Sequence, residues 1–297
     1  MDTSDVLSLL RLAPAVTVLA YASVLDWRTR RVPNIYWIAL SLVGLALIPI
    51  QFLADEADLK YLLIVLPILA ILLDVYWSPE GKRLLMDYMP GVMYTLAIVA
   101  IVVLAYLWGG DEYFQHFLAV PIMMLFIVVL YMLDVIRGGA DAKALLSLTI
   151  LFPFYPVLGS FPILHSDAPS AEIILPFSFV ILLTAAVVVC ILPLGFLAKN
   201  LASRDFQYPL AFLGYRMESA EIEKSHVWLM ERIQDGKHVT SARTRRDEDL
   251  RKEAEALSNA GYKRVWVTPK IPFIVPMTAS IILSSIIGNW LFYLFSF

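Results

Sequence analysis

The chain alternates long apolar runs with short polar segments, and this pattern predicts its architecture. Each run is close to the roughly 20 residues that an α-helix needs to cross a bilayer core. Backbone amides cannot stay unpaired in hydrocarbon, so runs of this kind must be helical. The eight runs are Leu7–Leu25, Ile35–Leu53, Tyr61–Trp77, Gly91–Trp108, Tyr113–Ile136, Ala142–Leu164, Ile173–Ala198 and Ile271–Phe297. We therefore predict an all-α polytopic membrane protein with about eight transmembrane helices.

The overall composition excludes a soluble globular chain. Hydrophobic residues make up 60% of the 297 positions and charged residues only 16%, which is far more apolar than a water-soluble domain of this size. The pattern changes at Lys199, where a segment of mixed charge begins. We expect a transmembrane bundle over residues 1–198, a small domain over residues 199–270 and a last transmembrane helix over residues 271–297.

Local patterns within the polar segment predict an α+β domain. Apolar residues recur at helical spacing over Thr244–Ala260, and Gly261 follows in a position that ends a helix. The next residues, Arg264–Thr268, alternate and are rich in β-branched and aromatic types, which favours a short strand. The domain is therefore expected to pack at least one helix against a sheet.

The charges beside the apolar runs predict the orientation of the chain, because cytoplasmic loops of membrane proteins are enriched in Lys and Arg. One set of alternating segments is basic and the other is acidic. The basic set holds Arg28, Arg30, Arg31, Lys82, Arg83 and Arg137, and the acidic set holds Asp55, Glu56, Asp58, Asp111, Glu112, Asp167 and Glu172. We expect both termini on the exported side, residues 199–270 in the cytoplasm, and a first helix that is a permanent anchor.

Ionisable residues near membrane depth are costly, so each is a functional candidate. Asp26 ends the first run and precedes a basic segment, so it either serves chemistry or pairs with the neighbouring arginines. Asp141 follows Gly138, Gly139 and Ala140 at the start of another run. Small residues let a second backbone approach closely, but an aspartate there is also a common helix N-cap. The predicted topology places both aspartates at the cytoplasmic membrane face, which favours a joint role.

Two further aspartates are rivals. Asp134 precedes Asp141 by seven residues, so on one continuous helix it would face the same side two turns away. Asp74 lies near the inner end of the third run, where an interfacial residue or a partner for Lys82 or Arg83 is the simpler interpretation.

Three segments of the chain resemble the GxGD-type aspartyl peptidases that process archaeal preflagellins and type IV prepilins. The first is "LDWRTRRVPN", which contains Asp26, and the second is "GGADAKALLSL", which contains Asp141. The third comprises "HVWLME" and "VWVTPKIPFIVP", which resemble the cytoplasmic domain and last helix of the archaeal preflagellin peptidases. Ala140 stands where the family pattern has glycine, and two additional apolar runs separate the two aspartates.

The resemblance implies a membrane-embedded aspartyl endopeptidase with Asp26 and Asp141 as the catalytic pair and Gly138, Gly139 and Ala140 as the motif beside it. Its substrates would be preflagellin (archaellin) or prepilin-like precursors with short basic leaders, cut at the cytoplasmic face of the cell membrane. Neither aspartate has a fixed role, because such a pair titrates as a unit. No metal, cofactor or nucleic acid is expected.

The single cysteine and the intramembrane carboxylates bear on two other functions. The bacterial prepilin peptidases that also methylate their product carry a cytoplasmic loop with several cysteines. This chain has only Cys190, so peptidase activity without methylation is expected.

An ion-coupled secondary transporter is the alternative function, because buried aspartates and several crossings also suit a carrier. A carrier would be expected to hold its carboxylates near the bilayer midplane, and no inverted repeat is evident.

Overall fold

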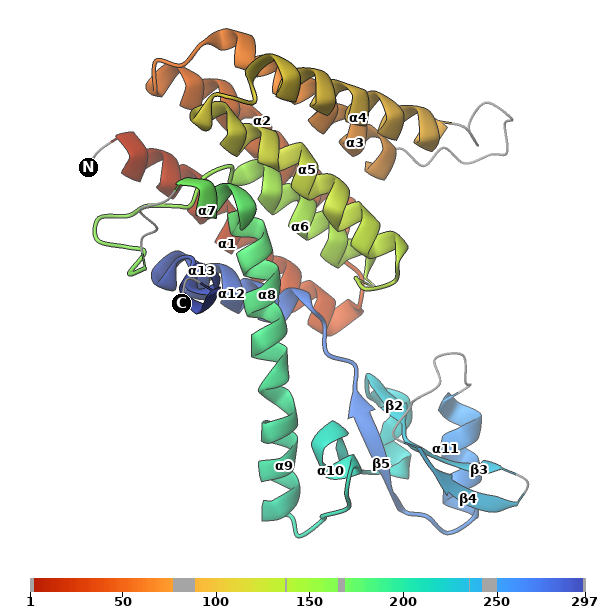
Figure 1. Cartoon of the computed structure of the whole chain (residues 1–297). Coiled ribbons are helices and arrows are strands. Elements are labelled where there is room, and N and C mark those ends of the chain that lie inside the picture. Colours follow the sequence, from red (N-terminus) through yellow and green to blue (C-terminus); the bar gives the residue numbers. More distant parts are fainter. Residues whose placement is uncertain are drawn as a thin grey trace. The chain divides into compact units, whose positions relative to one another are not determined.

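The computed structural model describes residues 3–76, 89–136, 138–164, 169–234, 236–241 and 250–295. The chain divides into two compact units, one formed by Met1–Ala185 with Pro272–Phe297 and the other by Ala186–Ile271. The first unit is a helix bundle, and the second combines helices with short strands (Figure 1).

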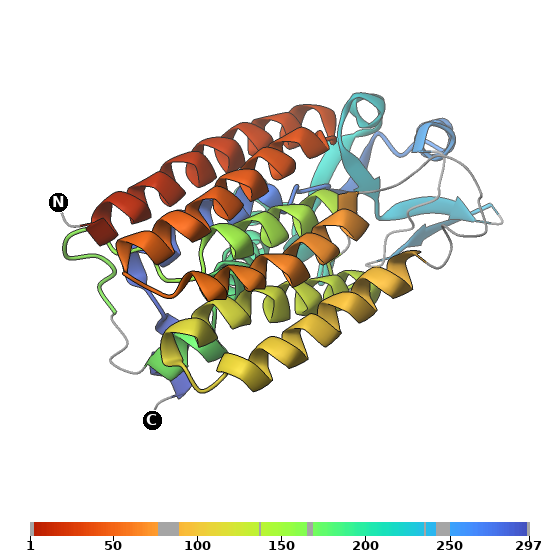
Figure 2. The same cartoon turned by 90° about the horizontal axis from the view of Figure 1, so that it is seen from above.

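The bundle is built from consecutive helices that run back and forth. They are α1 (Thr3–Thr29), α2 (Asn34–Ala54), the 3-10 helix η1 (Leu59–Ile64), α3 (Val65–Tyr76), α4 (Met89–Trp108), α5 (Glu112–Met132), α6 (Gly139–Leu151), α7 (Pro169–Ile174), α8 (Phe177–Cys190), α12 (Ile274–Ile287) and α13 (Trp290–Phe295). The N- and C-terminal ends of the bundle lie at the same end of it (Figure 2). The opposite end carries the α1–α2 connection, the last turn of α3, the first turn of α4 and the α5–α6 connection.

Six segments of the described chain are long and apolar enough to cross a membrane: α1, α2, η1 with α3, α4, α5, and α8 with α9 (Leu192–Ala202). The protein is thus a multi-pass membrane protein, but the expected count of eight is not confirmed. The run Ala142–Leu164 yields only the short helix α6, because Pro153 lacks an amide hydrogen and disfavours helical geometry at Phe152. The final run is interrupted at Gly288, whose φ is 90°.

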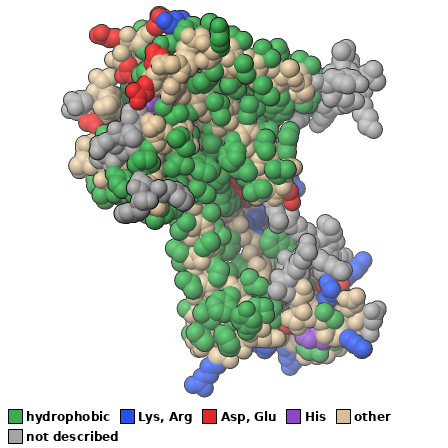
Figure 3. Space-filling model, in the orientation of Figure 1, with side chains coloured by type: hydrophobic (Ala, Val, Ile, Leu, Met, Phe, Trp, Pro, Cys, Tyr) green, Lys and Arg blue, Asp and Glu red, His purple; other side chains and the backbone are tan. Residues whose placement is uncertain are grey.

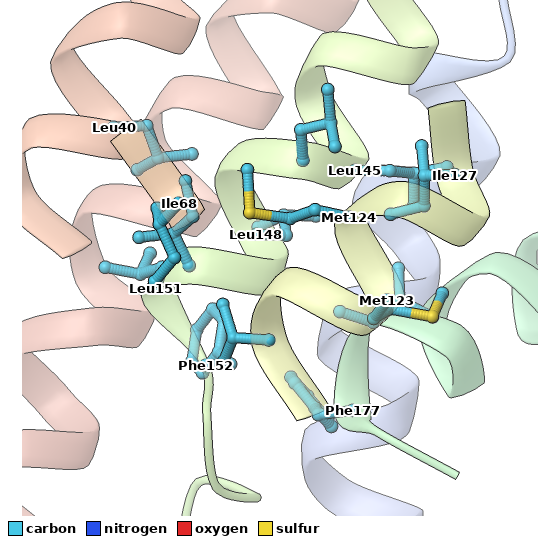
Figure 4. Packing of buried hydrophobic residues seen from close by; sticks show 14 of the residues in the cluster. Leu40, Ile68, Met123, Met124, Ile127, Leu145, Leu148, Leu151, Phe152 and Phe177 are labelled. Carbon is cyan, nitrogen blue, oxygen red and sulfur yellow. The ribbon is translucent and has the colours of Figure 1, made fainter. Parts of the chain in front are cut away.

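α6 is the central helix of the bundle. All but one of the residues from Ala142 to Leu151 are buried, and the helix packs against α1, α2 and α5. Figure 4 shows Leu145, Leu148 and Leu151 of α6 among side chains of α2, α3 and α5. A Cβ on Gly44 of α2 would stand 3.0 Å from the Leu151 amide nitrogen. The absence of a side chain at Gly44 therefore lets α2 and α6 approach closely.

The outer surface of the bundle is apolar, as expected for a lipid-facing one. Hydrophobic side chains cover most of the visible face of the bundle, while acidic residues gather at one end of it (Figure 3). The connections at that end supply Asp55, Glu56, Asp58, Asp111 and Glu112. The other polar segments that the sequence analysis used, at Lys82, Arg83, Arg137 and Asp167, lie outside the described residues.

The second unit confirms the expected α+β organisation. It contains α9, α10 (Leu210–Leu213), β1 (Tyr215–Glu218), η2 (Ser219–Lys224), β2 (Val227–Leu229), β3 (Glu231–Gln234), β4 (Lys237–Thr240), α11 (Leu250–Asn259) and β5 (Arg264–Pro269). β5 pairs antiparallel with β1 on one side and β2 on the other, and β3 and β4 form a hairpin. The predicted strand Arg264–Thr268 is β5. Of the predicted helix Thr244–Ala260, the part before Leu250 lies outside the described residues.

The core of this unit is formed by alternate faces of its central strand. Val265 and Val267 of β5 are fully buried against Leu257 of α11, while Trp266 is fully buried on the other face beside Met230. The Trp266 indole donates a 3.0 Å hydrogen bond to Gln207 Oε1. β5 is thus packed on both faces, which explains why its sequence is almost uninterruptedly apolar.

Candidate active site

Asp26 lies one turn before the end of α1. Its side chain is half-buried, and its carbonyl oxygen accepts a 3.0 Å hydrogen bond from the Arg30 amide. Arg30 has a φ of 57°, the left-handed conformation that ends many helices. The Arg30 guanidinium and the Asp26 carboxylate interact electrostatically. Asp26 therefore lies within electrostatic reach of a neighbouring arginine, and its side chain is partly accessible.

Asp141 lies in the first turn of α6 but is not its N-cap. Gly138 is the N-cap, and its carbonyl oxygen accepts the first helical hydrogen bond from the Ala142 amide at 3.0 Å. The carboxylate of Asp141 folds back over Gly138, so that a Cβ on Gly138 would come within 2.8 Å of Asp141 Cγ and closer still to its Oδ2. The N-cap interpretation of Asp141 is wrong, and Gly138 is the residue that makes room for this carboxylate.

Gly139 and Ala140 have weaker steric requirements than Gly138. A Cβ on Gly139 would meet only the Tyr131 hydroxyl, at an ordinary 3.6 Å. Ala140 is half-buried and already packs a methyl group against the bundle core. A methyl group therefore fits at position 140, so alanine can replace the glycine of the family pattern there without disturbing this turn.

The fold brings Asp26 and Asp141 together. α1 and α6 contact one another, and the two carboxylates are close enough for the charge of Asp26 to act on Asp141. One turn before Asp26, Ser23 Oγ lies 2.7 Å from Thr278 Oγ1 of α12, which holds the same end of α1 against the last helix. The site thus combines a carboxylate from each of two helices at the end of the bundle opposite to its acidic connections.

Asp134 does not share a helix with Asp141. α5 ends at Met132, and Asp134 is exposed in the following turn with a φ of 57°. Aspartate tolerates this left-handed conformation better than most residues. The premise that Asp134 faces the Asp141 side of one continuous helix is therefore wrong, and Asp134 serves to end α5.

Asp74 lies in the last turns of α3, and its carboxylate interacts with the Tyr94 hydroxyl of α4. Its suggested partners, Lys82 and Arg83, lie outside the described residues. Sequence reasoning missed Tyr94 and Lys143 near it. The signal for Lys143 was available, because a lysine two residues after Asp141 is a second ionisable group in an otherwise apolar helix.

The residues described here contain no cluster of three or more His, Cys, Asp or Glu side chains arranged to hold a metal ion. The site provides the two carboxylates of Asp26 and Asp141 beside the N-terminus of α6.

Comparison with known proteins points to the class of protein. Residues 207–290 match the family model described as Archaeal Peptidase A24 C-terminus Type II. The preflagellin peptidase of Methanococcus voltae is 23% identical over 258 residues, which cover 84% of this chain and 94% of that protein. The chain is similar to the archaeal preflagellin peptidases. The resemblance drawn from the three sequence segments is thereby confirmed.

A second relative extends the similarity. An uncharacterised protein of Methanocaldococcus jannaschii is 25% identical over 272 residues, which cover 89% of this chain and 87% of that protein. Both the matching family model and the Methanococcus voltae relative are named as peptidases. A transporter is not favoured by these relatives.

Proposed function

We propose that the chain is an aspartyl endopeptidase that removes the short basic leader from preflagellin or type IV pilin-like precursors at the cytoplasmic membrane face. The observation that carries the proposal is the convergence of Asp26 of α1 and Asp141 of α6 at one end of the bundle. The two residues lie 115 positions apart in the sequence, yet both occupy helix ends with partial access. The similarity to a preflagellin peptidase supports the same substrate class.

The proposed reaction uses the two carboxyl groups as a general base and a general acid. Close carboxylates in a site of low dielectric constant do not both ionise easily, so the pair shares one proton. The ionised carboxylate takes a proton from a water molecule, and the oxygen of that water attacks the scissile carbonyl carbon. The protonated partner gives its proton to the carbonyl oxygen. Collapse of the tetrahedral intermediate breaks the C–N bond: the carboxyl that took a proton from water gives it to the leaving nitrogen, and a hydroxyl of the intermediate returns a proton to the other carboxylate.

The surroundings of the pair suit this chemistry. Asp141 lies in the first turn of α6, where the helix dipole favours negative charge. Arg30 provides a positive charge near Asp26. Both influences stabilise one negative charge on the pair, while the mutual repulsion of the aspartates disfavours two. The roles belong to the pair, and we assign neither aspartate the base alone.

The membrane side of the site follows from the charge pattern. The end of the bundle that carries Asp26 and Asp141 also carries Arg28 and Arg31, while the opposite end carries Asp55, Glu56 and Asp111. Under the rule that positive residues stay inside, the aspartates lie at the cytoplasmic face. A precursor whose leader is in the cytoplasm and whose apolar helix is in the bilayer would present its cleavage site there.

Cleavage of a defined precursor tests the function. The purified full chain in detergent micelles is incubated with a candidate preflagellin, and the new N-terminus is identified by mass spectrometry. We expect a single cut between the basic leader and the apolar helix, with an unmethylated product. Cys190→Ser and a chelator should leave the rate unchanged. Loss of cleavage with the chelator, or a product cut within the apolar helix, would refute the proposed aspartyl peptidase.

A further inference from the structure

A second polar site lies at the same end of the bundle as Asp26 and Asp141. A cavity of about 330 Å³ is enclosed by α3, α4, α5 and α6. Its polar wall is formed by Asp74, Tyr94, Tyr131 and Lys143, and the remainder is largely aliphatic. Gly139 is also part of the wall, so the cavity begins one residue away from the glycine on which the Asp141 carboxylate rests.

The carboxylate of Asp74 retains unused acceptor capacity. Its polar neighbour is the Tyr94 hydroxyl, whereas a carboxylate has about four acceptor positions. Among the described residues, none of the ion pairs includes Asp74. Asp74 lines the cavity with this acceptor capacity unused, which suits a cationic ligand.

The cation of the wall is engaged by neutral groups instead. Lys143 Nζ donates a 3.0 Å hydrogen bond to Asn34 Oδ1 at the start of α2. It also lies 5.6 Å from the centre of the Tyr76 ring. These two contacts hold Lys143 against α2 and α3, and among the ion pairs of the described residues none joins it to Asp74.

We propose that this cavity is the subsite for a basic side chain of the leader, with Asp74 as its anionic anchor. The proposal rests on the proposed function and specifies how that site selects its substrate. The apolar wall accommodates the methylene stem of Lys or Arg, and Tyr94 and Tyr131 offer aromatic faces for the charged head. A precursor that crosses the aspartate pair passes Gly138 and Gly139, so a long side chain can enter the cavity.

A purely structural role for Asp74 makes a different prediction. If its interaction with Tyr94 only joins α3 to α4, loss of the carboxylate changes stability and affects all substrates alike. A binding role makes the effect depend on the charge of the substrate. Asp58, at the other end of the same helical segment, already pairs with Lys60 at 2.7 Å, so Asp58→Asn is a matched control far from the cavity.

The test measures kcat and KM for leader peptides in which each basic position is changed in turn to Gln, with the full chain in detergent micelles. For wild-type enzyme and the Asp58→Asn variant, we expect one such change to raise KM about tenfold, as for the loss of a charged hydrogen bond. For Asp74→Asn, KM should be equally high with the basic and the Gln peptide, while kcat changes less than about twofold. If the Gln peptide raised KM by the same factor in the Asp74→Asn enzyme as in wild type, the two changes would be independent and the proposed subsite would be wrong.

Charge reversal provides a second readout. Asp74→Lys should cleave the natural leader poorly and should recover when the critical leader position is Glu. Should Asp74 variants fail to fold, the wild-type series still decides, because an unchanged KM at every Gln position contradicts the proposal. These outcomes leave the peptidase proposal standing, whereas a wild-type chain that cuts no leader would remove both proposals together.

Discussion

The carboxylate of Asp141 occupies the space in which a side chain at position 138 would begin. A Cβ on Gly138 would lie within 2.8 Å of Asp141 Cγ, which is closer than real carbon contacts allow. The glycine is therefore coupled to the aspartate three residues later, and through it to Asp26 on α1. This relationship predicts that a larger residue at Gly138 disturbs the site more than one at Gly139 or Ala140.

Gly138→Ala is expected to displace the Asp141 carboxylate without unfolding the bundle. Activity should fall about 100-fold, the loss typical of a 1 Å misplacement in an active site. The matched control is Gly91→Ala in α4, where an added Cβ meets nothing within 4 Å. Cleavage assays combined with thermal denaturation of both variants check this expectation, and equal activity of the two would contradict it.

Asp26→Asn and Asp141→Asn are each expected to lower kcat by about 10²- to 10⁴-fold, because asparagine is nearly isosteric but does not exchange a proton. Expression and membrane insertion should stay normal. Asp134→Asn is the control, since Asp134 is exposed and asparagine also adopts its left-handed conformation readily. If Asp134→Asn abolished cleavage while Asp26→Asn did not, the pair would be wrongly assigned.

Gly44→Leu is expected to destabilise the bundle by pushing α2 away from α6. A Cβ there already lies 3.0 Å from Ile150 Cγ2 and from the Leu151 amide nitrogen, and overpacking of this kind costs about 1–3 kcal/mol. Gly195→Leu in α9 has open space at the same point and should be neutral. Unfolding in detergent, followed by intrinsic fluorescence, compares the two variants.

The acidic end of the bundle should lose stability in acid. Asp111 caps α5 through a 2.9 Å bond from the Tyr113 amide, and the hydrogen bond from the Tyr61 hydroxyl lowers the pKa of Asp111. A lowered folded-state pKa stabilises the protein above the unfolded value near pH 4 and ceases to do so as the pH falls through the folded value.

Tyr61→Phe should therefore lower the melting temperature at pH 6 and have a smaller effect at pH 3. The expected loss at pH 6 is about 1 kcal/mol after solvent screening. Tyr106→Phe is the control, because Tyr106 is 89% exposed. A Tyr61→Phe effect that is the same at both pH values would show that packing, and not the charged hydrogen bond, supports this end.

The orientation is tested by labelling from outside intact cells. In a Cys190→Ser background, a cysteine at the exposed Lys237 of the β3–β4 hairpin should resist a membrane-impermeant maleimide. A cysteine at the exposed Glu56, between α2 and η1, should react. Labelling of the first position in sealed cells would place residues 199–270 on the exported side and the aspartates with them.

The sequence identified two of the four membrane aspartates as a candidate pair but did not reveal the surroundings of the other two. Local position left the roles of Asp26 and Asp141 open, and the shared membrane face and the family resemblance singled them out. The same reasoning treated Asp134 as part of a continuous helix, because the apolar run does not reveal that the chain turns after Met132. Asp74 was interpreted as an interfacial residue or a partner for Lys82 or Arg83, and no local pattern indicated its neighbour Tyr94, which lies on a different helix.

The sequence by itself determined that the chain is a helical membrane protein with an α+β unit, and it revealed the segments with family resemblance. These features depend on local composition and periodicity. Only the tertiary structure decided that α6 stops at Leu151, that Gly138 rather than Asp141 caps it, and that Asp26 acts on Asp141. It also gathered Asp74, Tyr94 and Lys143 around one cavity. Such relations join residues from separate helices, and packing between helices sets them, so no single stretch of sequence carries them.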